Sequence, residues 1–174
     1  MDILIVDGYN MIGAWPELIE LKKKDLALAR DRLVEILADY AGYTGTKVIV
    51  VFDAYEVKGL ERKYRNYNID IIFTKENETA DEKIEKLAVQ LTNRRTKVFV
   101  ATSDYAEQWV IFGQGAFRKS ARDLYNEIQE MEKNLQTKLD TIQERRPLSN
   151  IPLSKEMLDY FEKLRRGQGR VVDA

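Results

Sequence analysis

Four aspartates stand where parallel strands and a helix would bring them together. Asp7, Asp53 and Asp104 each follow a short apolar run, and Asp81 lies at the start of a segment with a helical pattern. Because the carboxyl ends of parallel strands meet at one edge of a sheet, we expect these four side chains to share that edge. Crowded carboxylates repel one another unless a cation lies between them. The spacing therefore predicts a site for a divalent cation of the magnesium type.

The chain contains no histidine and no cysteine. This composition excludes a histidine general base, the usual catalytic triad and an imidazole metal ligand. It also excludes a thiolate nucleophile, a disulfide and any metal centre built on cysteine. Hydrolysis near neutral pH would then depend on carboxylates, lysines, hydroxyls or a hard metal ion. Mg²⁺ or Mn²⁺ suits such a carboxylate-rich site.

The first of these aspartates lies in the segment Asp7-Gly8-Tyr9-Asn10. In a metal site Asp7 would be a ligand, Gly8 would permit a tight turn and a close approach, and Asn10 would offer an amide oxygen. The same residue types also favour an ordinary turn after a strand. Asp53, taken alone, is explained equally simply as a residue that ends a strand and caps a loop. Three strands delivering an acid to one edge is the pattern that favours a site.

Asp81 and Asp104 have simple explanations as well, because acids stabilise the first turn of a helix. Thr79 and Glu82 form a capping-box pattern, so Asp81 is not needed for capping and can point outward. We therefore favour Asp81 over Glu82 as the acid that faces a metal. Asp104 could cap a helix that follows the fourth strand, although Ser103 could do so equally well.

Short segments rich in valine and isoleucine alternate with segments of helical periodicity. Buried strands are predicted near residues 2–7, 47–53, 69–73 and 97–102. Helices are predicted near residues 25–41, 80–93, 104–112, 119–142 and 155–165. This alternation is typical of an α/β fold with a mostly parallel sheet. We expect one domain over residues 1–145, with residues 146–174 as a linker, a short helix and a tail that pack on it.

Several common α/β sites are excluded by their missing motifs. The first strand is not followed by G-x-G-x-x-G, and no Walker A loop is present, so we expect no nucleotide cofactor. A receiver domain would need paired acids after the first strand, and a haloacid dehalogenase-type phosphatase would need Asp-x-Asp there. This chain has Asp7-Gly8-Tyr9 at that point.

Two groups of basic residues are candidates for holding a nucleic acid. The first mixes cations with an aromatic residue directly after the strand that ends in Asp53, and the second lies near the start of a long helix. Cations can contact phosphates while tyrosine stacks on unpaired bases. An ordinary solvated loop explains the first group about as well. The candidates are Lys58, Arg62, Lys63, Tyr64, Arg65, Arg118, Lys119 and Arg122.

The beginning of the chain carries no basic segment ahead of a long apolar one, which argues against an export signal. No stretch approaches the ~20 apolar residues of a membrane span. We therefore expect a cytoplasmic protein with no membrane partner.

Residues 3–10, 51–54, 78–81 and 100–104 resemble, in the same order, the motifs of NYN-domain proteins, relatives of the PIN-like nucleases. The resemblance is closest to the YacP-like branch, whose members look like messenger-RNA endonucleases that work with the ribosome. It implies a three-layer α/β sandwich with C-terminal helices, and cleavage of single-stranded RNA with Mg²⁺ or Mn²⁺. It also implies roles for particular residues: Asp7, Asp81 and Asp104 at the acidic positions, Asp53 as a further one, and Asn10 and Ser103 as polar supports.

Our hypothesis from the sequence is a metal-dependent endoribonuclease that acts on messenger RNA. Asn10 and Ser103 would position water or the scissile phosphate, and in-line attack would leave a 5′-phosphate and a 3′-hydroxyl. One alternative is a PIN-like module that binds RNA or the ribosome without cutting. Another is a phosphatase or phosphotransferase with Asp7 or Asp53 as its nucleophile, in which the basic and aromatic residues would have no evident use.

Overall fold

The structure is a computed structural model that describes residues 1–54, 69–104, 113, 115–145 and 154–165. Its contacts divide the chain into two compact units, Met1–Lys133 and Asn134–Ala174. The first unit contains the sheet and the helices that cover it. The second contains the end of α6 (Ala121–Arg145) and all of α7 (Lys155–Arg165). How residues 146–174 pack on the domain stays a prediction.

A sheet of five parallel strands forms the centre of the first unit. The strands are β1 (Asp2–Asp7), β2 (Lys47–Phe52), β3 (Asp70–Phe73), β4 (Lys97–Thr102) and β5 (Phe117–Ser120). Their order is β3-β2-β1-β4-β5, and each neighbouring pair is parallel. Within β1, Ile5 pairs with Ile49 on one side and with Val100 on the other. The three central strands therefore end together, which places the residues that follow them at one edge.

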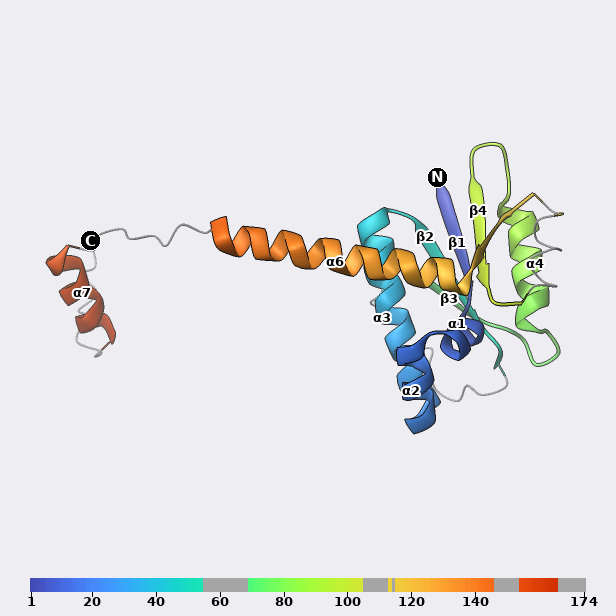
Figure 1. Cartoon of the computed structure of the whole chain (residues 1–174), viewed down its shortest axis with the longest axis horizontal. Coiled ribbons are helices and arrows are strands. Elements are labelled where there is room, and N and C mark those ends of the chain that lie inside the picture. The colour runs from blue at the N-terminus through green and yellow to red at the C-terminus, as the bar shows by residue number, and fades with distance from the viewer. Residues whose placement is uncertain (55–68, 105–112, 114, 146–153, 166–174) are drawn as a thin grey trace, which may run out of the picture. The chain divides into compact units, whose positions relative to one another are not determined.

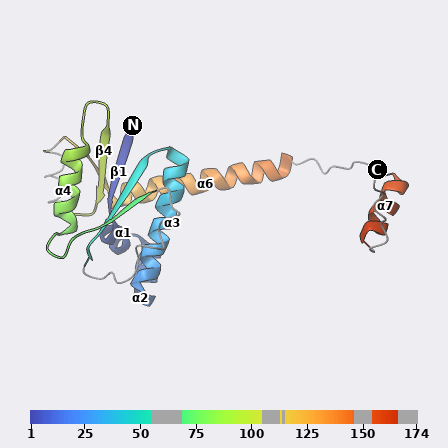
Figure 2. The same cartoon turned by 180° about the vertical axis from the view of Figure 1, so that it is seen from behind.

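Helices cover both faces of this sheet and make three layers (Figures 1 and 2). Leu4 and Val6 of β1 point to one face, while Ile3 and Ile5 point to the other, with the period of two that a strand imposes. The first face packs on α1 (Gly8–Ala14), α2 (Pro16–Lys24), α3 (Leu26–Thr44) and the first part of α6. The second face packs on α4 (Ala80–Leu91). The predicted α/β sandwich with a parallel sheet is confirmed.

Two short helices, α1 and α2, replace the turn and loop expected after the first strand. Asp7 itself caps α1, because its side chain accepts a hydrogen bond from the Asn10 backbone N–H. Trp15 separates the two helices, and Pro16 begins α2 at a position where its missing N–H costs nothing. The segment Asp7–Asn10 is thus a helix start, and the tight-turn interpretation of Gly8 is wrong.

Gly8 is needed for a different reason, which is its contact with the last residue of β2. A Cβ built on Gly8 would overlap the ring of Phe52, and Phe52 is completely buried. Only a residue without a side chain lets α1 approach the end of β2 this closely. The expected close approach therefore exists, and it is made to the protein's own core.

The strand β5 was not predicted, because Phe117–Ser120 has no apolar run. Lys119 and Ser120, expected at the beginning of the long helix, belong to this strand, and α6 starts at Ala121. The helix expected near residues 104–112 lies almost wholly outside the described residues. Among the helices that the structure describes, none is long and apolar enough to cross a membrane.

Candidate functional site

The carboxyl edge of the sheet brings the four predicted aspartates into one electrostatic group. Asp7 ends β1, Asp53 follows β2, and Asp104 lies two residues after β4. Asp81 occupies the first turn of α4, which starts at the same edge because it follows β3 along the chain. The charge of Asp81 acts on Asp7, and the charges of Asp53 and Asp104 act on Asp81. Asp81 is therefore the acid through which the other three are coupled.

Asp7 is the most deeply buried acid of the group, with 3% of its surface exposed. It accepts hydrogen bonds from the Asn10 backbone N–H at 3.1 Å and from the Asn10 side-chain amide at 2.5 Å. Burial raises the pKa of Asp7 above its ordinary value, and the charge of Asp81 raises it further, while the Asn10 hydrogen bonds oppose the rise. The pKa of Asp7 stays raised because the desolvation of its carboxylate outweighs the stabilisation by those hydrogen bonds.

Asn10 and Ser103 connect the two central strands through a chain of hydrogen bonds. The Ser103 hydroxyl donates to the amide oxygen of Asn10, and the Asn10 amide nitrogen donates to Asp7. A side chain after β4 thus fixes the orientation of a carboxylate at the end of β1. In this arrangement Asn10 holds Asp7 in place, and its amide oxygen, expected to face a metal ion, accepts from Ser103. That Asn10 and Ser103 position water or the scissile phosphate stays a prediction.

At the start of α4, Asp81 and not Glu82 takes part in the acidic group. Burial raises the pKa of Asp81, and the charges of Asp104 and Asp53 raise it further. The charge of Glu82 instead acts on Lys86, one turn along the helix. Thr79 caps the helix by accepting from the Glu82 backbone N–H at 3.2 Å. That bond uses the main chain of Glu82 and leaves its side chain without a capping role in this contact.

Two buried threonines at strand ends support the site, and the sequence analysis did not single them out. Thr74 follows β3, accepts from the Ala54 N–H at 3.0 Å, and donates to the Asp53 carboxylate at 3.3 Å. Thr102 ends β4, is fully buried, and accepts from the Asp104 N–H at 3.1 Å. A sequence signal was available only for Thr102, which closes an apolar strand two residues before Asp104, where its hydroxyl can fix the next segment of backbone.

The donor chemistry of this edge suits a hard divalent cation. The four side chains offer only carboxylate oxygens, the ligands that magnesium and manganese prefer. In the part of the chain that the structure describes, no lysine or arginine forms an ion pair with Asp7, Asp53 or Asp81. As the described side chains stand, no three acids are close enough to form a ready metal-binding group. Asp7, Asp53 and Asp81 thus have no cationic partner among the described residues, and the described acids are not drawn into one coordination sphere.

The predicted RNA-binding residues fall into two sets with different outcomes. Lys58, Arg62, Lys63, Tyr64 and Arg65 lie outside the described residues. Arg118 lies on β5 and Arg122 in the first turn of α6, and both are exposed. Lys119 is half-buried, pairs with Glu127 at 2.7 Å, and lies 5.4 Å from the centre of the Phe99 ring. Lys119 is therefore committed to the fold, and Arg118 and Arg122 are the two candidates of this set whose side chains are exposed.

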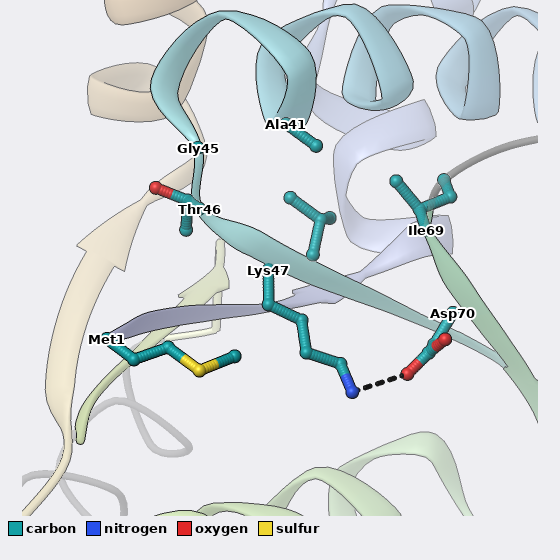
Figure 3. A pocket seen from close by; sticks show the side chains of 8 residues that line it. Met1, Ala41, Gly45, Thr46, Lys47, Ile69 and Asp70 are labelled. Carbon is teal, nitrogen blue, oxygen red and sulfur yellow. Dashed lines mark ion pairs between the residues drawn. The ribbon is translucent and has the colours of Figure 1, made fainter. Parts of the chain in front are cut away.

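A pocket of about 440 Å³ lies at the opposite, amino edge of the sheet (Figure 3). It is lined by residues at or before the starts of β1, β2 and β3: Met1, Ala41, Gly45, Thr46, Lys47, Val48, Ile69 and Asp70. Lys47 and Asp70, its two charged side chains, form an ion pair at 3.0 Å. This pocket contains none of the residues singled out from the sequence.

A parallel α/β sheet with acids gathered at its carboxyl edge is the arrangement expected for nuclease-like NYN domains, and comparison with known proteins confirms that class. A profile of the YacP-like NYN domain matches residues 4–166. The chain therefore belongs to the YacP-like NYN family. It is 58% identical over 167 residues to the protein YacP of Bacillus subtilis (strain 168), with 96% of this chain and 98% of that protein covered.

Two solved structures agree with the described fold. A crystal structure of Rae1 (YacP) from Bacillus subtilis matches with a TM-score of 0.76 at 57% identity, covering 96% of each chain. The structure of its W164L mutant matches with a TM-score of 0.75 at 54% identity, covering 95% of this chain and 96% of that one. The family predicted from the four motifs is thus confirmed over nearly the whole chain.

Proposed function

We propose that this protein is a metal-dependent endoribonuclease that cleaves single-stranded RNA at the carboxyl edge of its sheet. The observation that carries the proposal is the electrostatic group of Asp7, Asp53, Asp81 and Asp104. Burial and mutual repulsion raise the pKa of Asp7 and of Asp81. A bound cation would offset the unfavourable free energy of keeping these carboxylates ionised. Membership of a nuclease-like family supports the same conclusion independently.

The site residues have two kinds of proposed role: some bind the cation, and others fix the orientation of those ligands. Asp7, Asp81 and Asp104 would hold Mg²⁺ or Mn²⁺, with Asp53 as a further ligand or an orienting group. The bound ion would supply an activated water and neutralise charge on the phosphate. Asn10 and Ser103 keep the Asp7 carboxylate in a fixed rotamer, so that no reorganisation is needed during the reaction. In-line attack on phosphorus would break the bond to the 3′-oxygen, leaving a 3′-hydroxyl and a 5′-phosphate.

For the substrate we propose messenger RNA, presented by the ribosome in the cytoplasm. This part rests on the resemblance to the YacP-like branch. The exposed Arg118 and Arg122 are consistent with an RNA substrate. Both lie after β4, in the segment formed by β5 and the start of α6, and this segment leads to the carboxyl edge of the sheet. Phosphate contacts from such cations position a strand without reading its sequence.

The test is cleavage of 5′-labelled single-stranded RNA, both free and as messenger RNA in a translating extract, by wild type and by Asp7→Asn and Asp81→Asn. We expect both variants to lose activity by about 100-fold or more. Substituting a residue that only hydrogen-bonds to a metal ligand already lowers metal affinity or activity by about 10–100-fold. Wild-type cleavage should disappear with a chelator and return with Mn²⁺. Asp70→Asn, an acid at the opposite edge, is the matched control and should keep full activity. Wild type that leaves both substrates intact, or an active Asp7→Asn, would overturn the proposal.

A second candidate is a PIN-like module that binds RNA or the ribosome without cutting. It is favoured by one observation, that no three described acids stand close enough to form a ready metal group. It predicts that RNA survives incubation with Mn²⁺ and that Asp7→Asn binds RNA as wild type does. A phosphotransferase, in contrast, would leave a phospho-aspartate on Asp7 or Asp53 that mass spectrometry detects.

A further inference from the structure

A buried arginine lies beside the acidic edge and has no carboxylate partner among the described residues. Arg30, in the second turn of α3, has 5% of its surface exposed. It takes part in no ion pair in the described chain, and its Nε–H, which is inaccessible to solvent, has no hydrogen-bond partner. Burying a charge and a donor in this way is unfavourable unless something compensates them. Arg30 was not predicted as a site residue, because an arginine inside a helical segment is normally exposed to solvent.

The guanidinium of Arg30 is directed at Tyr9, which belongs to the same motif as Asp7 and Asn10. Its Nη1 donates to the Tyr9 hydroxyl at 3.0 Å. Tyr9 lies in the first turn of α1, between the buried Asp7 and the amide that fixes it. The Tyr9 ring contacts Phe52 edge-on, with centroids 5.3 Å apart, and Phe52 directly precedes Asp53. Tyr9 therefore connects Arg30 to the ends of both β1 and β2, where the acids stand.

The charge of Arg30 is not used to balance those acids. Asp7, two residues before Tyr9, takes its hydrogen bonds from Asn10 and not from Arg30. A protein that only had to stabilise its aspartates would pair them with this cation. Instead, the cation is kept behind a half-buried phenol, and a hydrogen bond from a charged donor polarises that hydroxyl. A polarised hydroxyl beside a metal-type site is suited to an anionic oxygen of the substrate.

We propose that the Tyr9 hydroxyl contacts a backbone phosphate of the RNA next to the one that is cleaved, and that Arg30 is the positioning residue that holds and polarises it. The inference rests on the proposed RNA substrate and adds a phosphate subsite on the α1–α3 side of the acidic edge. The phosphate charge would compensate the buried guanidinium in the bound state.

The test compares two pairs of matched variants in RNA binding and in cleavage. Tyr9→Phe keeps the ring against Phe52 and removes only the hydroxyl. Tyr40→Phe is its control, because Tyr40 lies near the end of α3 and its hydroxyl bonds to Glu127 of α6. Arg30→Met removes the buried charge, and Arg32→Met is its control, because Arg32 pairs with Glu17 and Glu35. Binding is measured by fluorescence anisotropy of labelled single-stranded RNA in the Asp81→Asn background, so that no cleavage interferes.

We expect Tyr9→Phe and Arg30→Met each to weaken RNA binding about tenfold, and the double variant to be no weaker than either one, since the two residues act as a unit. In the cleaving protein KM should rise about tenfold while kcat changes less than about threefold. The dependence of binding on salt should fall by a slope of about 0.7 in Arg30→Met, the value for one phosphate of a single strand. Arg30→Lys, which keeps the charge, should keep that slope.

Binding of Tyr9→Phe equal to that of Tyr40→Phe would overturn the inference, as would an unchanged salt slope in a folded Arg30→Met. Tyr9→Phe alone decides the question if Arg30→Met fails to fold. The proposed function fails separately, through wild type that does not cleave RNA. The binding measurement remains decisive for the phosphate subsite in that case, because it needs no catalysis.

Discussion

The two edges of the same sheet treat their charges in opposite ways. At the amino edge Lys47 pairs with Asp70, and the N-terminal ammonium donates to the Arg95 carbonyl at 3.3 Å. At the carboxyl edge Asp7 and Asp81 carry raised pKa values and no described cation pairs with them. The amino edge has a pocket of about 440 Å³ whose charges are already satisfied. The edge where we propose the chemistry is therefore the one whose acids Asp7 and Asp81 have raised pKa values, and not the one with the described pocket.

The largest difference between the edges should appear when a divalent ion is added. A ligand that binds only the folded protein, present at 100 times its Kd, stabilises it by about 2.7 kcal/mol. We expect Mn²⁺ to raise the melting temperature of wild type and of Asp70→Asn, and not that of Asp81→Asn. Differential scanning fluorimetry against a chelator control measures this. An equal rise in Asp81→Asn would place the ion elsewhere.

Glycine-to-alanine substitutions at Gly8 of α1 and Gly42 of α3 should change the stability of the fold in opposite directions. Gly8→Ala forces a Cβ into the Phe52 ring and should destabilise the fold by about 1–3 kcal/mol, as overpacking does. Gly42→Ala, near the end of α3, meets no atom within 4 Å and should stabilise by about 0.5–1 kcal/mol through helix propensity. Urea unfolding measures both. Two changes of the same sign would contradict the close packing at the carboxyl edge.

The smallest predicted effect is a pH-dependent one on stability without metal. An acid whose pKa is raised on folding binds its proton more tightly in the folded state, so its contribution to stability is present below the ordinary value of 3.8 and is lost as pH rises through the folded value. Asp81→Asn should therefore be more stable than wild type at pH 7, even though an acid in the first turn favours α4. The gain should vanish as pH falls towards 3.8.

Asp70→Asn provides the opposite sign in that experiment. Its ion pair with Lys47 is exposed, so its loss should lower stability at pH 7 by only about 0.2–1 kcal/mol. Melting temperatures of both variants, taken in chelator from pH 4 to pH 7, separate the two edges. A less stable Asp81→Asn at pH 7 would show that the favourable charge of Asp81 in the first turn of α4 outweighs repulsion among the acids.

The sequence predicted the parts of the fold whose signal is local and strong. Four strands and the helices α3, α4 and α7 follow from apolar runs and helical periodicity, and their observed bounds lie within a few residues of those predicted. The helix α1 was missed because Asp7, Gly8 and Asn10 have turn propensity, which tertiary packing against Phe52 overrides. The helix α2, which follows it, was not predicted either. β5 was missed because it is an edge strand of four residues with two cations, and such a segment lacks the alternation of apolar and polar residues that predicts a strand.

The four acids of the candidate site, with Asn10 and Ser103 as supports, were named from the sequence, whereas Thr74, Thr102 and Arg30 were not. Parallel strands must deliver Asp7, Asp53 and Asp104 to one edge, so a topology inferred from alternation was enough to bring them together. The roles of Thr74, Thr102 and Arg30 depend on which side chains meet across elements, and residue type alone does not encode that. The hydrogen bond from Ser103 to Asn10 joins residues 93 positions apart and required the register of β1 with β4.

The most direct test is a crystal of the protein soaked in Mn²⁺, with anomalous scattering measured at the manganese edge. We predict a peak at the carboxyl edge of the sheet, within coordination distance of Asp81 and at least one of Asp7 and Asp104, and none beside Asp70. A manganese peak confined to other parts of the molecule, or an ordered site at that edge that stays empty at saturating Mn²⁺, would contradict the account.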